Sequence, residues 1–330
     1  MLIMTKSVMV MMLGFIFAIS LGSILIPILK NRKINQRLSI YLEEKHKKKQ
    51  NIPTMGGLIF IIPTTIILLF LILLNKINIS INFLIIIFTL LSYSIIGFID
   101  DYLIIKRNNN NGLKEGTKFL MQVVIAIIFF YFFMISDNEP LLWIHSLNLK
   151  LDIGWMYGIF ILFVLVASSN AVNITDGLDG LAGGLSIIAF ITFGIISWNT
   201  TWLIGYEEIA VLCFSLAGSL LGFLVFNVNP AKIFMGDTGS LALGATLGAI
   251  AILTRHELLL LLIGIVFVIE TLSCIIQRIY YKFTHKRIFL MTPIHHSFEK
   301  KGYNEKEIVK AFWIVGLLAG MLALTFGVFL

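Results

Sequence analysis

Residues 170–184 read NAVNITDGLDGLAGG and stand between two long apolar runs, at 156–172 and 180–198. Each run is long enough to cross a lipid bilayer as a helix, so the polar residues between them fall where a membrane segment meets water. Charges are costly at this depth and usually serve a function. The aspartates, Asp176 and Asp179, are suited to hold a hard cation or to accept hydrogen bonds from sugar hydroxyls, and the glycines let a ligand approach the backbone. The stretch predicts a polar site at a membrane boundary.

The composition supports a membrane protein. Hydrophobic residues make up 58% of the 330 residues and charged residues 13%, which excludes a soluble globular protein. The apolar stretches are continuous and do not alternate, so they predict helices and exclude an outer-membrane barrel. Both cysteines, Cys213 and Cys274, fall inside apolar stretches, where small packing residues are more common than a disulfide or a metal site. We expect an all-α integral membrane protein that forms one polytopic domain, residues 1–330.

Ten apolar stretches predict ten transmembrane helices, with both termini on one side of the membrane. The first stretch is too long for a signal peptide, and no small-residue cleavage pattern follows it. Between the third and fourth runs, residues 108–111 predict a solvated turn. Between the fourth and fifth runs, residues 136–155 predict an interfacial hairpin or short helix. The predicted spans are 8–29, 55–74, 81–99, 117–135, 156–172, 180–198, 207–226, 238–254, 258–281 and 308–329.

Lys and Arg are distributed unevenly over the connections. Of the 25 in the chain, all but Lys6, Lys76, Lys150 and Arg255 lie in or beside the odd-numbered connections. Cytosolic connections carry such an excess, so we expect these to face the cytosol and both termini to face outward. The same connections contain nearly all the polar motifs: IPTMGG at 52–57, DDY at 100–102, NITDGLDG at 173–180, FNVNPAKIFMGDTGS at 226–240 and TPIHHSFEKKG at 292–302.

Three aspartates in these motifs are candidates for chemistry. Asp100 and Asp101 end the third span; adjacent carboxylates repel, which favours a nearby cation and suits one of them to accept a proton. A solvated helix end is the alternative. Asp237 opens the eighth span, where a helix N-terminus and two glycines form a cradle for a phosphate or carboxylate. An ordinary helix cap is the alternative there, but Asn227 and Lys232 just upstream favour a site.

The last motif contains adjacent histidines, His295 and His296. Such a pair can hold a phosphate or move a proton near neutral pH, whereas a zinc site is less consistent with the spacing. The basic residues around the pair also suit anionic lipid headgroups. In the ninth span, Gln277 lies near the cytosolic end, within reach of a ligand at headgroup level, and Glu270 is deeper, where a structural role is favoured.

Taken together and in this order, the motifs PTMGG, GFIDDY, NITDGLDGLAGG, PAKIFMGDTGS, ETLSCIIQ and TPIHHSFEKKGY resemble the phospho-N-acetylmuramoyl-pentapeptide transferase family. The resemblance runs from about Lys49 to Glu305. It implies that UDP-MurNAc-pentapeptide and undecaprenyl phosphate react, with Mg²⁺, to give lipid I and UMP. It also implies a multi-pass protein of the bacterial inner membrane with a cytosolic active face, a homodimer, contact with membrane lipid and no nucleic-acid partner.

The resemblance carries roles to individual residues. Asp100 is the candidate base or nucleophile, Asp101 its partner and Asp237 the magnesium ligand. Candidates near uracil are Lys49, Gly177, Leu178, Asp179 and Phe234. Candidates near the ribose are Thr54, Asn173, Asp176 and Gly236. The rest of the nucleotide groove would be lined by Gln277, His295 and His296, with Asn227 in the loop before Asp237 and Lys106 or Lys118 as phosphate contacts.

Three departures from the family pattern stand out. Ser297 replaces a third histidine, Asn51 and Ile52 replace the usual Gly-Thr, and Ile104 replaces a lysine after DDY. A sister transferase that uses UDP-GlcNAc is the rival enzyme hypothesis. A transporter or flippase is the rival from another class, for which buried charges are typical. The acidic residues here gather at one surface and not at mid-bilayer, which favours an enzyme.

Overall fold

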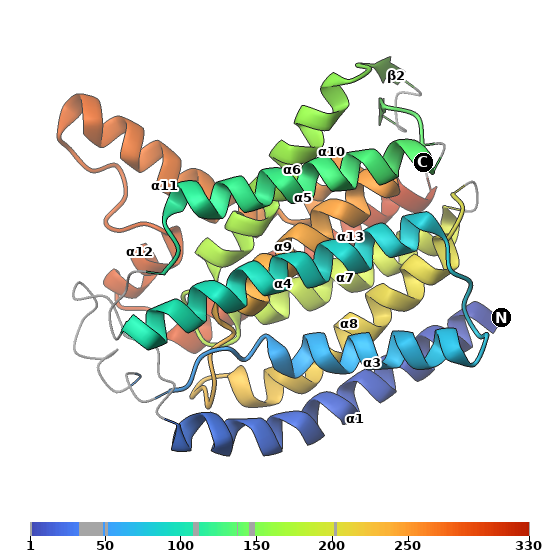
Figure 1. Cartoon of the computed structure of the whole chain (residues 1–330). Helices are drawn as coiled ribbons and strands as arrows, with labels where there is room; N and C mark the ends of the chain where they lie inside the picture. Colours follow the sequence, from blue (N-terminus) through green and yellow to red (C-terminus); the bar gives the residue numbers. More distant parts are fainter. Residues whose placement is uncertain are drawn as a thin grey trace.

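The computed structural model describes residues 2–32, 49, 52–107, 112–136, 138–144, 149–200 and 203–329. The chain folds into a bundle of helices with one small hairpin (Figure 1). Asn51 and residues 108–111 lie outside the described residues. The elements are α1 (Leu2–Asn31), α3 (Leu58–Leu73), α4 (Ile81–Arg107), α5 (Glu115–Ile135), β1 (Leu141–Ile144), β2 (Leu149–Asp152), α6 (Met156–Thr175), α7 (Leu181–Asn199), α8 (Tyr206–Asn227), α9 (Gly236–Leu253), α10 (Glu257–Ile263), α11 (Ile265–Thr284), α12 (Ile294–Lys300), α13 (Glu305–Leu324) and a π-helical turn, η2 (Thr325–Phe329).

The predicted apolar helices are present, but the spans predicted at 55–74 and 258–281 differ from the prediction. Within the described residues, eight helices are long and apolar enough to cross a membrane, and α3 is a shorter apolar helix. The predicted span 258–281 is wrong as a single helix, because α10 and α11 meet at an angle of 85°. The break falls at Gly264, the residue between the two helices. Glycine has low helix propensity, and hydropathy alone does not detect such a bend.

The bundle is built around α9, the most deeply buried span, which packs against α4 and α6. Small residues make this possible. A methyl group added at Gly244 would lie 2.2 Å from the carbonyl oxygen of Ser168 in α6, and one at Gly97 in α4 would lie 2.1 Å from the carbonyl oxygen of Asp237. Close helix approach through small residues is the usual way that membrane helices associate. It brings the start of α9 against the end of α4.

The two ends of the bundle carry different elements of the chain. The N-terminus and C-terminus lie at the same end, and α11 and α12 project at the opposite end (Figure 1). β1 and β2 form an antiparallel hairpin in the predicted interfacial segment, pairing Leu141 with Asp152. Arg255, at the far end of α9 from Asp237, donates a hydrogen bond to the carbonyl oxygen of Leu141 (3.0 Å). The hairpin is therefore anchored at the end of α9 opposite Asp237.

Candidate active site

Asp237 lies at the centre of the polar end of the bundle. One carboxylate oxygen accepts a hydrogen bond from the Lys118 ammonium of α5 (2.6 Å), and the other accepts one from the Asn173 amide of α6 (2.7 Å). Asn173 also donates to the hydroxyl of Ser240, one turn further along α9 (2.9 Å). Three predicted site residues, from three separate helices, are thus joined by direct contacts. Lys118, one of the two candidate phosphate contacts, reaches Asp237, and its contact with phosphate stays a prediction.

The two adjacent aspartates of α4 have different surroundings. Asp101 accepts hydrogen bonds from the backbone N–H groups of Asp237 (3.1 Å) and Thr238 (3.0 Å) and from the Thr238 hydroxyl (2.6 Å). The predicted cradle at the start of α9 is therefore formed, and the carboxylate in it is Asp101. Such a contact satisfies the free N–H groups at the start of the helix and places a negative charge at the positive end of the helix dipole, which is favourable. Asp101 fixes α4 to α9.

The charge of Asp100 interacts with those of Asp237 and Lys118. Its Oδ1 accepts a hydrogen bond from the backbone N–H of Leu113 (2.8 Å). A methyl group at Gly112 would lie 2.5 Å from Oδ2 of Asp100, so the backbone before α5 passes directly over this carboxylate. Asp100 and Asp237 are thus two acidic groups that share a single lysine.

The segment before α3 forms one wall of the site. Its backbone pairs with the loop before α9: Phe234 donates to the carbonyl of Pro53 (2.8 Å), and Gly56 donates to the carbonyl of Phe234 (2.8 Å). Gly236 has φ of +71°, a conformation that suits glycine. A methyl group there would lie 2.6 Å from the Thr54 hydroxyl and 2.5 Å from Asp101. Thr54 and Gly236, both predicted near the ribose, are therefore neighbours.

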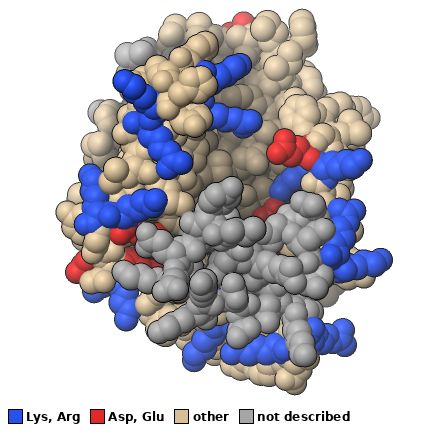
Figure 2. Space-filling model, turned by 90° about the vertical axis from the view of Figure 1, so that its left-hand side faces the viewer, with Lys and Arg blue, Asp and Glu red and all other residues tan. Residues whose placement is uncertain are grey.

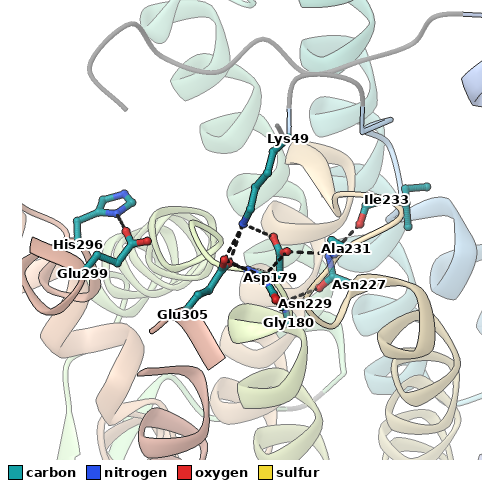
Figure 3. A network of polar contacts seen from close by, with 10 residues as sticks. All are labelled: Lys49, Asp179, Gly180, Asn227, Asn229, Ala231, Ile233, His296, Glu299 and Glu305. Atoms are coloured by element: carbon teal, nitrogen blue, oxygen red, sulfur yellow. Dashed lines mark hydrogen bonds and ion pairs between the residues drawn. The ribbon is translucent and has the colours of Figure 1, made fainter. Parts of the chain in front are cut away.

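A second polar network surrounds Asp179 (Figure 3). The Lys49 ammonium contacts a carboxylate oxygen of Asp179 at 2.6 Å and one of Glu305 at 2.7 Å. Asn229 donates to both carboxylates, at 3.1 Å and 2.9 Å, and the backbone N–H of Ala231 donates to Asp179 (3.0 Å). Burial would by itself lower the pKa of Lys49, but the two carboxylates outweigh it and the pKa is raised. Lys49 is therefore a stable cation here.

Glu305 was not among the residues predicted from the sequence. It begins α13 and accepts a hydrogen bond from the backbone N–H of Asp179 (2.7 Å) as well as from Lys49. An acidic residue in the first turn of a helix is common, since it faces the positive end of the helix dipole. No local signal distinguishes it from an ordinary first-turn glutamate. Only the fold brings it to Lys49.

Asn227 lies behind this network. It is 2% exposed, its carbonyl oxygen accepts from the Gly180 N–H (3.0 Å), and its amide donates to the Ile233 carbonyl (2.9 Å). Both ends of the side chain thus hold the turns on either side of it, at the start of α7 and before α9. Its predicted contact with substrate stays a prediction, and the structure gives it a positioning role.

The histidine motif meets the central turn through His295. His295 is fully buried, and its Nδ1 lies 3.1 Å from the carboxylate of Glu270 in α11. A methyl group at Gly177 would lie 2.4 Å from its Nε2. Burial lowers the pKa of His295, and Glu270 offsets part of that effect, so the ring is neutral at neutral pH. His296 is partly exposed and contacts Glu299 at 2.6 Å (Figure 3).

The remaining predicted residues fall around these two networks. Asp176 ends α6, and burial together with the charges of Asp237, Asp179 and Asp101 raises its pKa to about 7. Leu178 is buried and Phe234 is partly buried. Gln277 accepts hydrogen bonds from the backbone N–H groups of residues 288 and 289 (3.1 and 2.9 Å) and lines a cavity beside α11.

The arrangement suits a cation bound with the help of a ligand. Within the described residues, no group of three or more His, Cys, Asp and Glu side chains is arranged to hold a metal alone. Five carboxylates nevertheless influence one another at this end, and the Lys118 ammonium contacts Asp237. The donors are oxygen atoms, which Mg²⁺ prefers, and Mg²⁺ commonly uses one or two carboxylates plus substrate phosphates. The residues therefore fit such an ion.

Comparison with known proteins places the chain in a family. The family model described as "Glycosyl transferase family 4" matches residues 83–255, and "Phospho-N-acetylmuramoyl-pentapeptide-transferase signature 1" matches residues 49–61. A phospho-N-acetylmuramoyl-pentapeptide-transferase of Listeria innocua is 45% identical over 96% of this chain and 96% of its own length. The chain belongs to this transferase family. Transferases of the same name from Bacillus pumilus and Bacillus subtilis are 43% and 42% identical, each over at least 96% of both chains.

Membership of the transferase family agrees with the positions of the site residues. The signature match begins at Lys49, whose ammonium contacts Asp179, and it includes Thr54 beside Gly236. The broader match ends at Arg255, so it contains the aspartates of α4, α6 and α9 but not the histidine motif. Similarity extending over nearly the whole chain excludes a short shared motif as its origin.

Proposed function

We propose that the protein transfers phospho-MurNAc-pentapeptide from UDP-MurNAc-pentapeptide to undecaprenyl phosphate, giving lipid I and UMP. The relatives that share its length carry the name of this activity. The structural observation that carries the proposal is the meeting of Asp100, Asp237 and Lys118, from three helices, at one end of a membrane bundle. Phosphoryl transfer to a lipid needs charged groups of this kind at the bilayer surface.

Mg²⁺ is proposed as the cofactor, with Asp237 as its ligand and Asn173 orienting that carboxylate. When bound, the ion would neutralise charge on the diphosphate of the nucleotide. The Lys118 ammonium now neutralises Asp237. When the ion is bound to Asp237, Lys118 would pair with a phosphate of the substrate. Asp101 is held by the start of α9 and acts through the backbone of Asp237 and Thr238, whose position it fixes.

Asp100 is proposed as the base or nucleophile. Its Oδ1 is held by the backbone N–H of Leu113. Its carboxylate stands beside Asp237 and Lys118, which is where an acceptor phosphate would have to approach a nucleotide held on Asp237. As a base it would take the proton of the lipid phosphate, which would attack the sugar-bearing phosphorus and release UMP. As a nucleophile it would itself attack that phosphorus and release UMP, and the lipid phosphate would then take the phosphosugar and free the carboxylate.

The nucleoside would bind between the two networks. Lys49 and Asp179, with Gly177, Leu178 and Phe234 nearby, are proposed for the uracil, and Phe234 offers an aromatic surface for stacking. The proposed ribose contacts are Thr54, Asn173, Asp176 and Gly236. His295 and His296 would line the rest of the nucleotide groove, beyond the uracil and the ribose. Glu270 contacts His295 and would fix the orientation of its ring.

The location follows from the charge distribution. We propose a bacterial inner membrane protein with this site at the cytosolic face, because many described Lys and Arg side chains gather at the end that carries the site (Figure 2) and cytosolic connections carry such an excess. A homodimer stays a prediction; light scattering of the detergent-solubilised protein would test it.

The deciding experiment measures UMP release by purified protein with undecaprenyl phosphate, with and without Mg²⁺. We expect release from UDP-MurNAc-pentapeptide and none from UDP-GlcNAc. Release from UDP-GlcNAc alone would replace the proposed donor with that of the sister transferases. Full release by both Asp100→Asn and Asp237→Asn proteins would remove these residues from the chemistry.

A further inference from the structure

The cavity beside α11 is lined by Gln277 and by eight residues that have no part in the site described so far. It has a volume of about 640 Å³, within the range of cavities that bind small ligands. It lies between α11, the chain that follows it, and α12. Its lining residues are Cys274, Gln277, Arg278, Tyr281, Arg287, Phe289, Met291, Thr292 and Lys300.

The cavity is positively charged. Arg278, Arg287 and Lys300 come from three different segments, and in the part of the chain that the structure describes none of them is in an ion pair with a carboxylate. Tyr281 and Phe289 add aromatic surface. Figure 2, which looks onto this end of the molecule, shows Lys and Arg side chains gathered around a hollow. Three cations that have no carboxylate partner among the described residues favour an anionic ligand in the cavity.

The cavity and the histidine motif share two helices, α11 and α12. α12 carries both Lys300, in the cavity wall, and His295, which touches the central turn at Gly177. α11 carries both Gln277, in the wall, and Glu270, which holds His295. The two elements that frame the cavity are therefore the two that position the histidine. The cavity therefore lies next to the segment that carries His295 and His296.

We propose that this cavity binds the peptide portion of the nucleotide substrate, with Arg278, Arg287 and Lys300 holding its carboxylates. The inference rests on the proposed function, since the peptide is the part of that substrate for which the residues above provide no contact. A peptide always brings at least one carboxylate, at its C-terminus. It also brings apolar groups that fit against Tyr281 and Phe289. A lipid phosphate offers the same negative charge, and the tests below separate the two.

The first test is binding, measured by calorimetry with two nucleotides, UDP-MurNAc-pentapeptide and peptide-free UDP-MurNAc. In the double variant Arg278→Gln/Arg287→Gln we expect the Kd of the pentapeptide nucleotide to rise about tenfold, which is ~1.4 kcal/mol, because two exposed ion pairs are lost. The Kd of UDP-MurNAc should stay within about twofold. Lys282→Gln is the matched control, because Lys282 lies on the same helix but outside the cavity lining.

The second test uses Cys274, which lines the cavity and is partly exposed, whereas Cys213 is fully buried. A maleimide reagent should therefore label Cys274, and Cys274→Ala protein should label little. We expect UDP-MurNAc-pentapeptide to slow the labelling at least fivefold. Neither UDP-MurNAc nor vesicles containing phosphatidylglycerol should do so.

The outcomes are distinguishable. Equal weakening of both nucleotides in the double variant, or protection of Cys274 by phosphatidylglycerol vesicles alone, would overturn the proposal, and the second result would assign the cavity to a lipid phosphate. Unchanged binding of both nucleotides would overturn it too. Failure of the wild-type protein to release UMP from UDP-MurNAc-pentapeptide would instead refute the proposed function.

Discussion

Glu305 provides the sharpest test of the site, because the sequence alone did not single it out. The proposed change is Glu305→Gln. Glu305 accepts from Lys49 with both oxygens, at 2.7 and 2.9 Å, from the Asp179 N–H at 2.7 Å and from Asn229 at 2.9 Å. Glutamine keeps the shape and one acceptor oxygen but loses the charge. Its amide group would also face the amide of Asn229 or the Lys49 ammonium.

The expected size of the effect follows from these contacts. Hydrogen bonds to charged groups contribute about 1.5–3 kcal/mol each, and the side chains of Lys49 and Glu305 are both only 14% exposed, so solvent screens their contact little. Asp179 still holds Lys49 in the variant, so the network is loosened and not removed. We expect a loss of about 1.4 kcal/mol in nucleotide binding, which is a tenfold rise in KM.

The assay is UMP release at varied UDP-MurNAc-pentapeptide and saturating undecaprenyl phosphate. The KM for the nucleotide should rise about tenfold while kcat changes less than about threefold, because Glu305 touches the groups proposed for uracil and not Asp100 or Asp237. Glu307→Gln is the matched control. Glu307 closes a capping box with Asn304 on the same helix, and glutamine also serves in that position.

An unchanged KM in the Glu305→Gln protein, with the unfolding temperature of the wild type, would refute the reasoning. A fall in kcat at constant KM would contradict it differently, since the network would then act on the reacting phosphates. If both variants lowered the unfolding temperature equally, the effect would belong to the start of α13 and not to the contact with Lys49.

Further predictions concern the helix contact, the metal and the buried histidine. Gly97→Ala should destabilise the protein by at least ~2 kcal/mol, because its methyl group would meet the backbone of Asp237 at 2.1 Å; Gly116→Ala, with nothing within 4 Å, should unfold at or slightly above the wild-type temperature. Mg²⁺ at a hundredfold excess over its Kd should stabilise the wild type by ~2.7 kcal/mol, seen as a higher unfolding temperature with UMP present, and Asp237→Asn should abolish this gain. The pKa of His295 is lowered in the folded protein, so the unfolded chain gains a proton first as pH falls below about 6.5. Stability should therefore decline from about pH 6.5 down to the folded pKa. The His295→Asn protein should lack this part of the decline, and identical pH profiles of unfolding temperature in the variant and the wild type would contradict the assignment.

The site was only partly predictable. The motifs placed Asp100, Asp176 and Asp237 at one end of the bundle correctly, because each follows or precedes an apolar run and the runs alternate in direction. Two features were not predictable in this way. The single span expected at 258–281 is broken at Gly264 by 85°, and the carboxylate in the cradle at the start of α9 comes from Asp101. Both depend on which helices pack together, which local hydropathy does not encode.

The sequence by itself determined that the chain is a bundle of membrane helices and that its charged motifs lie at helix ends. The physical reason is that burial in lipid forbids unpaired charge along a span, so hydrophobicity and turn residues mark the boundaries locally. Only the tertiary structure decided which polar groups pair. Lys118 reaches Asp237 across 119 residues, and Lys49 reaches Glu305 across 256. Such contacts depend on the close approach of α4 and α6 to α9 and on the position of α13, which arise from packing between helices.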